Sequence, residues 1–170
     1  MTLYSSIEFI IKIVNANINK HYHPMLKNIK EHLAVGSIAD LDKLQEIHQQ
    51  GYHTIIDLCT EKEGNLLDEK AMTDLGFKHF HIPVSVQNLN MDTLNKIQEA
   101  INCASQYVYI RCASGLRAGV MTLLTIADEE NWTQEQYQEE FNKLGLQHKP
   151  DCPLENFAQN YFTHHKEKKS

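Results

Sequence analysis

The chain has 170 residues, enough for one domain with a hydrophobic core, and its 42% hydrophobic and 22% charged residues are usual for a soluble globular protein. The formal net charge of -6 disfavours general binding to nucleic acid or to an anionic membrane, since both need an excess of positive charge. Four cysteines without a C-x-x-C pair suit neither a structural zinc site nor a disulfide framework, and they predict a reducing, cytoplasmic environment.

The apolar spacing at the start of the chain predicts a helical appendage, residues 1–30, interrupted near His23 and Pro24. Its one apolar patch, FIIKIV, is short and contains Lys12, and the segment lacks the basic start and cleavage site of a signal peptide. No run approaches the roughly 20 apolar residues that span a bilayer. A helix on a membrane surface is the alternative, but few basic residues cluster here, so we expect no membrane partner.

Strand-like and helix-like segments alternate through the rest of the chain. The expected strands are 32–37, 53–59, 78–84 and 107–112, and the expected helices are 39–51, 66–77, 91–105, 115–132, 133–145 and 153–165. In the expected helix 39–51, one face carries Leu41, Leu44, Ile47 and His48. This order predicts a three-layer α/β domain over residues 31–165, with a mostly parallel sheet of four to five strands flanked by helices, and a frayed tail at 166–170.

The segment YIRCASGLRAGVM, residues 109–121, places Cys112 at the end of a buried strand and Arg117 at the start of a helix. Ligands in such folds bind at this edge of the sheet. Backbone N–H groups in the loop can form an anion-binding concavity, and the positive helix end favours an oxyanion and a cysteine thiolate alike. Gly115 permits an unusual backbone conformation, and Arg117 can bind phosphate oxygens through two N–H groups. The alternative is that Cys112 is an inert, buried packing residue.

The loop and three upstream segments, AVGS, TIIDL and HIPV, resemble the protein-tyrosine and dual-specificity phosphatase superfamily. The closest resemblance is to the bacterial beta-lactamase-hydrolase-like phosphatases, which share the short loop of four residues between cysteine and arginine, and it covers roughly residues 32–130. It implies a cysteine-phosphatase fold and hydrolysis of a phosphate monoester, phosphotyrosine-like or a small phosphorylated molecule, without metal or cofactor. Cys112 would form a cysteinyl-phosphate intermediate that water then hydrolyses. The phosphate oxygens would be bound by Arg117 and by the amides of Ala113, Ser114, Gly115 and Leu116.

Three positions depart from the pattern of this superfamily. Arg111 stands where histidine is common, and Ala118 stands where serine or threonine often assists breakdown of the intermediate. The general acid is usually an aspartate beyond the HIPV-like strand, where Asp92 is the candidate; its alternative role is to balance the dipole of the helix that begins there. Asp57, inside a strand, is a poorer candidate. These departures predict slow catalysis, a substrate with a good leaving group, or a binding module without turnover.

Two other functions therefore remain open. A rhodanese-like sulfurtransferase would carry a persulfide on Cys112, since a gap of four residues between cysteine and arginine also occurs there. A catalytically weak phosphate-binding module would keep the loop without turnover. The histidine pairs His79 with His81 and His164 with His165 are expected to face solvent, and no metal site is expected.

One further cysteine and two glutamates lie near the expected site. Cys59 ends a neighbouring strand and is a candidate for a protective disulfide with Cys112, against the alternative of buried packing. Glu61 and Glu63 border the same edge, where we expect a solvated loop. The oligomeric state does not follow from the sequence.

Overall fold

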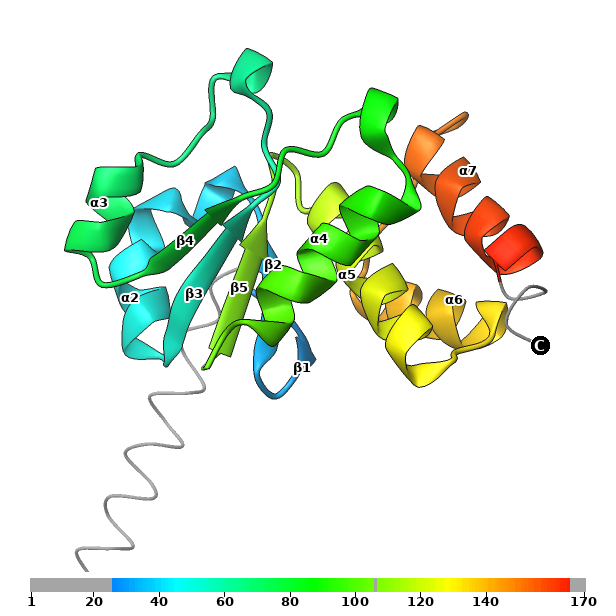
Figure 1. Ribbon diagram of the computed structural model, residues 1–170, viewed down its shortest axis with the longest axis horizontal. Coiled ribbons are helices and arrows are strands. Elements are labelled where there is room, and N and C mark those ends of the chain that lie inside the picture. The colour runs from blue at the N-terminus through cyan, green and yellow to red at the C-terminus, as the bar shows by residue number, and fades with distance from the viewer. Residues whose placement is uncertain (1–25, 106, 166–170) are drawn as a thin grey trace, which may run out of the picture.

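Five strands form one mixed sheet in the computed structural model, which describes residues 26–105 and 107–165 (Figure 1). The spatial order is β1-β2-β5-β3-β4; β1 runs antiparallel to β2, and the other neighbours are parallel. The predicted sheet of four to five strands, mostly parallel, is therefore confirmed. The strands are β1 (Lys27–Lys30), β2 (Leu33–Gly36), β3 (Tyr52–Asp57), β4 (Lys78–His81) and β5 (Tyr107–Arg111).

Strand β1 differs from the sequence-based expectation, which placed residues 27–30 in a helical appendage. These residues form an edge strand that pairs with β2, with Lys27 opposite Val35 and Asn28 opposite Ala34. The pairing gives their backbone groups partners on β2, which the local apolar spacing of the chain does not reveal. The rest of that expectation, residues 1–25, lies outside the described residues, as does the tail 166–170.

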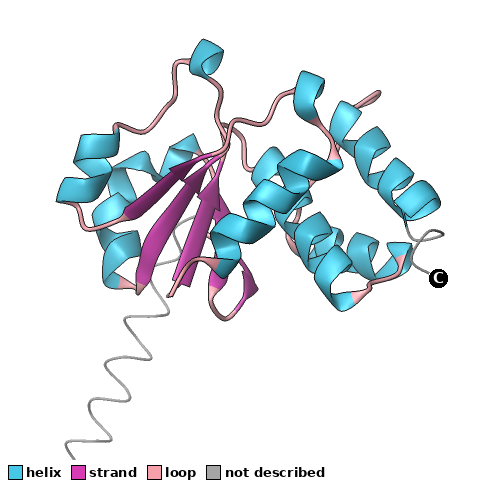
Figure 2. Ribbon diagram, viewed as in Figure 1, coloured by secondary structure: helices cyan, strands magenta, loops and turns pink. Residues whose placement is uncertain are grey.

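Helices cover both faces of the sheet, which confirms the three layers (Figures 1 and 2). One face carries α2 (Leu44–Gln49) and α3 (Glu69–Asp74). The other carries the larger set: α4 (Met91–Asn102), α5 (Leu116–Glu130), α6 (Gln134–Lys143) and α7 (Pro153–Asn160), which continues into a single π-helical turn, Tyr161–His165. No helix within the described ranges is long and apolar enough to cross a membrane.

The helix expected at 39–51 is divided in the structure. Residues Ile38–Lys43 form a 3-10 turn, and Leu41 is 41% exposed, whereas Leu44 and Ile47 of α2 are buried as expected. Ser37 and Asp40 close a capping box in the first turn, and the Asp40 side chain, rather than Leu41, turns into the protein. Asp40 Oδ2 there accepts hydrogen bonds from the Ser37 amide and the Tyr109 hydroxyl, each at 2.9 Å.

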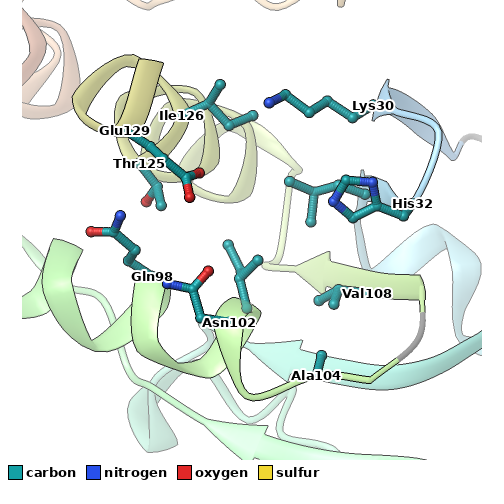
Figure 3. A pocket seen from close by; sticks show the side chains of 11 residues that line it. Lys30, His32, Gln98, Asn102, Ala104, Val108, Thr125, Ile126 and Glu129 are labelled. Atoms are coloured by element: carbon teal, nitrogen blue, oxygen red, sulfur yellow. The ribbon is translucent and has the colours of Figure 1, made fainter. Parts of the chain in front are cut away.

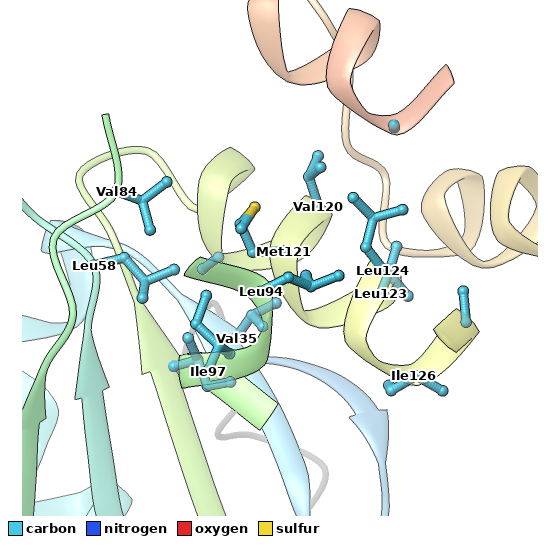
Figure 4. Close-up of a cluster of buried hydrophobic side chains, with 14 of the residues drawn as sticks. Val35, Leu58, Val84, Leu94, Ile97, Val120, Met121, Leu123, Leu124 and Ile126 are labelled. Atoms are coloured by element: carbon cyan, nitrogen blue, oxygen red, sulfur yellow. The ribbon is translucent and has the colours of Figure 1, made fainter. Parts of the chain in front are cut away.

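Helix α5 is the central element of the larger layer. Every residue from Ala118 to Ala127 is buried, because α5 packs against α4, α6 and α7 as well as β2 and β5. Figure 4 shows the apolar side chains of α4 and α5 meeting those of the sheet, with Leu94 and Ile97 beside Val35. Because α5 is closely packed on all sides, it gives a firm support to the loop that leads into it.

Candidate active site

The segment that connects β5 to α5 lies at the carboxyl ends of three parallel strands. Cys112 follows β5 directly, and its amide donates to Gly36 O of β2 at 3.4 Å. Ala113 O accepts a hydrogen bond from the Ile38 amide at 3.1 Å, and on the other side the Leu58 amide donates to Arg111 O at 2.9 Å. Backbone bonds from both neighbouring strands thus hold the loop in place.

The Cys112 side chain is fully buried, and its sulfur faces backbone donors. Sγ accepts from the Gly115 amide at 3.1 Å and from the Ala118 amide at 3.5 Å. Gly115 caps α5 with a φ of +88°, a conformation that a side chain would strain, and this turn directs the loop amides toward the sulfur. The sulfur therefore lies against two backbone donors at the N-terminal, positive end of a 15-residue helix.

Arg117, in the first turn of α5, ties together three segments that are distant in the sequence. Its Nη1 donates to Glu63 Oε2 at 2.9 Å and to Val84 O at 2.9 Å, with a longer contact of 3.4 Å to Leu58 O. Its Nη2 donates to the other oxygen of Glu63. Nε makes no hydrogen bond within the described ranges. A guanidinium has five N–H donors, so Arg117 retains donors that these contacts do not use.

Glu63, expected from the sequence to lie in a solvated loop at the edge of the site, instead pairs with Arg117, a role that the sequence did not reveal. The hydrogen bond from Arg117 lowers the pKa of Glu63 from 4.5 to about 2, and the backbone and side-chain bonds from Thr60 act in the same direction. Glu63 is therefore ionised at neutral pH and cannot donate a proton. The spacing Thr60-x-x-Glu63 was the available signal, because it forms a capping box that presents the carboxylate to Arg117.

Arg111, the residue before Cys112, is fully buried on the other side of β5. Its Nε lies 3.6 Å from Asp57 Oδ1 of β3, and its Nη2 donates to Asn65 O at 2.8 Å and to Cys59 Sγ at 3.0 Å. Asp57 also accepts from the amides of Cys59 and Leu67, at 3.0 and 3.1 Å. Both carboxylate oxygens of Asp57 therefore bind the segment that follows β3. This is a structural role.

The four cysteines are free thiols. Burial raises the pKa of Cys59 to about 11, so this thiol is neutral at physiological pH. The Cys59 sulfur faces Arg111, whereas the Cys112 sulfur faces the amides at the start of α5. The two neighbouring cysteines therefore occupy different environments.

Asp92 lies in the first turn of α4 and is exposed. The loop before it, residues 82–90, has no acidic residue. Arg117 binds this loop at Val84 O, and Asn90 ends it by accepting a hydrogen bond from the Thr93 amide at 3.0 Å. Arg117 therefore connects this loop to the site, and Asp92 is the first residue with a carboxyl group after the loop.

The described histidines differ in their surroundings. Within the described ranges, no three His, Cys, Asp or Glu side chains are grouped so that they could hold a metal ion. His81 Nε2 lies 2.8 Å from Cys59 O, and burial lowers the pKa of His79. His164 is exposed, and the side chain of His165 lies outside the described residues.

Two cavities differ in their position relative to Cys112. One, of about 510 Å³, includes Ser114 and Leu116 of the loop in its wall. The other, of about 260 Å³, is lined by residues at the start of β2 and β5 and near the ends of α4 and α5, with Lys30 and Glu129 at its rim (Figure 3). Since strands β2 and β5 are parallel, this second cavity lies at the end of the sheet opposite Cys112.

Comparisons with known proteins support the fold. No family model matches the chain, and no curated protein matches it. Among solved structures, it is similar to a DUF442 protein of Shewanella putrefaciens CN-32 described as a candidate phosphatase, with 18% identity over 88% of this chain and 94% of that one and a TM-score of 0.67. A candidate phosphatase of Neisseria meningitidis Z2491 shares 20% identity over 81% and 96%, with a TM-score of 0.61. PTPMT1 in complex with PI(5)P shares 16% over 86% and 100%, with a TM-score of 0.63. The chain thus has the protein-tyrosine and dual-specificity phosphatase-like fold.

Proposed function

We propose that the protein is a cysteine-dependent phosphatase of the tyrosine or dual-specificity type, which hydrolyses a phosphate monoester through a cysteinyl-phosphate intermediate. The fold shared with known phosphatases supports this. The observation that carries it is the environment of Cys112, whose buried sulfur faces the amides of Gly115 and Ala118 at the positive end of α5. Backbone donors and the positive end of a helix are the surroundings that a nucleophilic cysteine beside a bound oxyanion needs.

In the proposed reaction the Cys112 thiolate attacks phosphorus. A sulfur–phosphorus bond forms, the phosphorus–oxygen bond to the leaving group breaks, and the leaving oxygen takes a proton. Water then attacks phosphorus, inorganic phosphate leaves, and the thiolate is restored. Charge develops on the equatorial oxygens in both steps. The Nε edge of Arg117 and the backbone amides of Ala113, Ser114, Gly115 and Leu116 stabilise that charge.

The proposed proton donor is Asp92. Glu63 lies nearer to Arg117 but is ionised at neutral pH, because its pKa is about 2. Asp57 is held by Arg111 and two backbone amides. Asp92, at the start of the helix that follows the Val84 loop, is the remaining candidate of the two that the sequence singled out. The reaction requires Cys112 in the reduced state, which suits the cytoplasm.

Hydrolysis of p-nitrophenyl phosphate tests the proposal, with Cys112→Ser as the decisive variant. We expect it to abolish turnover and to retain phosphate binding, because the serine hydroxyl is a poor nucleophile while Arg117 and the loop amides remain. Cys103→Ser is the matched control, because Cys103 is exposed, at the end of α4, and should leave the rate unchanged.

The same preparations separate the alternatives. Thiocyanate formed from thiosulfate and cyanide, without release of phosphate from the aryl ester, would identify a sulfurtransferase that uses Cys112. Phosphate binding by the wild type without either activity would identify a binding module. Full phosphatase activity in Cys112→Ser would exclude the proposed nucleophile.

A further inference from the structure

The cavity beside the loop is large enough for a small organic molecule. Its volume is about 510 Å³, within the range of about 300–1,000 Å³ that is common for small-molecule sites. Ser114 and Leu116 form the wall on the side of the proposed phosphate site. The rest is formed by Lys27 of β1, by residues 145–147 and 149–152 between α6 and α7, and by Pro153 at the start of α7. A phosphate bound by the loop would therefore have its organic part next to this cavity.

The walls of the cavity are fixed by contacts outside it. Lys27 Nζ donates to Leu144 O at 2.5 Å, which ties β1 to the end of α6. Leu146 packs so closely on Gly119 of α5 that a Cβ at Gly119 would overlap it. Farther along, the His148 ring stacks on Phe141 with centroids 4.6 Å apart. The cavity is thus preformed, and a ligand binds without the cost of ordering its walls.

The lining combines apolar surface with positive charge. Leu116, Leu146, Pro150 and Pro153 offer surface for a carbon skeleton, and two lysines, Lys27 and Lys149, stand against one carboxylate, Asp151. In a chain with a net charge of -6, a local excess of cations beside a phosphate site favours a ligand with more negative charge than the phosphate alone. Lys27 already binds a carbonyl, so exposed Lys149 is the cation with the greater freedom to reach a ligand.

We infer that this cavity binds the organic part of the substrate, and that the substrate is a small organic phosphate with a second anionic group, a carboxylate or a phosphate, which pairs with Lys149. The inference rests on the proposed function, because it assigns the phosphate to the Cys112 loop. It goes further in naming a substrate class and a residue that determines specificity.

Two aryl phosphates test this assignment by their KM values. With 4-carboxyphenyl phosphate, we expect Lys149→Ala to raise KM about threefold and Lys149→Glu about tenfold, as for a solvent-exposed charge pair lost or reversed. With phenyl phosphate, KM should change much less, and kcat should be unchanged for both substrates. Lys96→Glu is the matched control, because it makes the same charge change at an exposed position on α4. Equal changes in KM for the two substrates would overturn the inference.

Protection of Cys152 gives a second test that does not need turnover. Cys152 lies in the cavity wall, and exposed Cys103 on another surface is an internal control. In the Cys112→Ser variant, 4-carboxyphenyl phosphate should slow the reaction of Cys152 with N-ethylmaleimide and leave that of Cys103 unchanged; adding Lys149→Glu should remove most of the protection. If no aryl phosphate is hydrolysed but Cys152 is protected in this way, the proposed function fails and the cavity assignment stands. Absence of protection would refute the cavity assignment, and equal protection by phenyl phosphate would refute the pairing of a second anionic group with Lys149.

Discussion

Replacing Glu63 with glutamine tests whether the ion pair with Arg117 positions that arginine. Glu63 accepts hydrogen bonds from both terminal nitrogens of Arg117 and from Thr60, whose amide lies at 2.6 Å and whose hydroxyl lies at 2.8 Å. The lowering of its pKa from 4.5 to about 2 corresponds to about 3–4 kcal/mol, at about 1.4 kcal/mol per pKa unit. The side chains of Arg117 and Glu63 remain 18% and 26% exposed, so water screens the pair. We therefore expect Glu63→Gln to lower the free energy of unfolding by about 1–2 kcal/mol at neutral pH.

The same substitution should slow catalysis. Glutamine keeps the shape of the side chain but removes the charge that draws the guanidinium toward Glu63, so Arg117 would spend less time with Nε directed at the phosphate. We expect kcat/KM for p-nitrophenyl phosphate to fall about tenfold, which corresponds to about 1.4 kcal/mol of transition-state stabilisation. Glu61→Gln is the control, since Glu61 is an exposed residue of the same turn. It should leave the rate and the stability unchanged.

The contribution of Glu63 to the free energy of unfolding should depend on pH. Because folding lowers the pKa of Glu63, the stabilisation is fully present above pH 4.5 and is lost as the pH falls toward about 2. Urea unfolding of the wild type and Glu63→Gln should therefore converge over that range. Two results would refute the reasoning. A faster variant would show that Glu63 competes with phosphate for Arg117, and a stability difference that persists to pH 2 would show that the ion pair is not its source.

Three further substitutions test separate parts of the structure. Asp92→Asn should slow hydrolysis of an alkyl phosphate about a hundredfold and that of p-nitrophenyl phosphate little, because only the alkoxide needs a proton to leave; equal effects would remove Asp92 from the mechanism. Gly36→Ala should cost about 1–3 kcal/mol in urea unfolding, since its methyl group would overlap Asp40 and Tyr109 in a buried site, and an unchanged midpoint would contradict this. Arg111→Met should cost about 3–5 kcal/mol because it leaves the buried Asp57 carboxylate unpaired, whereas the double variant with Asp57→Asn should cost less than the two single losses together.

The fold was largely predictable because its strongest signals are local. The β-branched runs of β3 and β5, the amphipathic pattern of α4 and the glycines after the shorter helices each depend on a few consecutive residues. The errors occur where a distant partner decides the outcome. Residues 27–30 form a strand because β2 lies beside them, and Leu41 is exposed because Asp40 turns inward to meet Tyr109.

The candidate site also combines features that local sequence reveals with features that depend on distant contacts. The sequence by itself determined that Cys112, Gly115 and Arg117 lie together where a strand is followed by a helix, since they fall within six consecutive positions. Only the tertiary structure decided that Arg117 pairs with Glu63, 54 residues away. It likewise joined Arg111 to Asp57 and placed Lys149 beside the loop. The physical reason is that contacts between distant segments follow from the order of strands in the sheet and from the packing of α5, and no local pattern of residues encodes either.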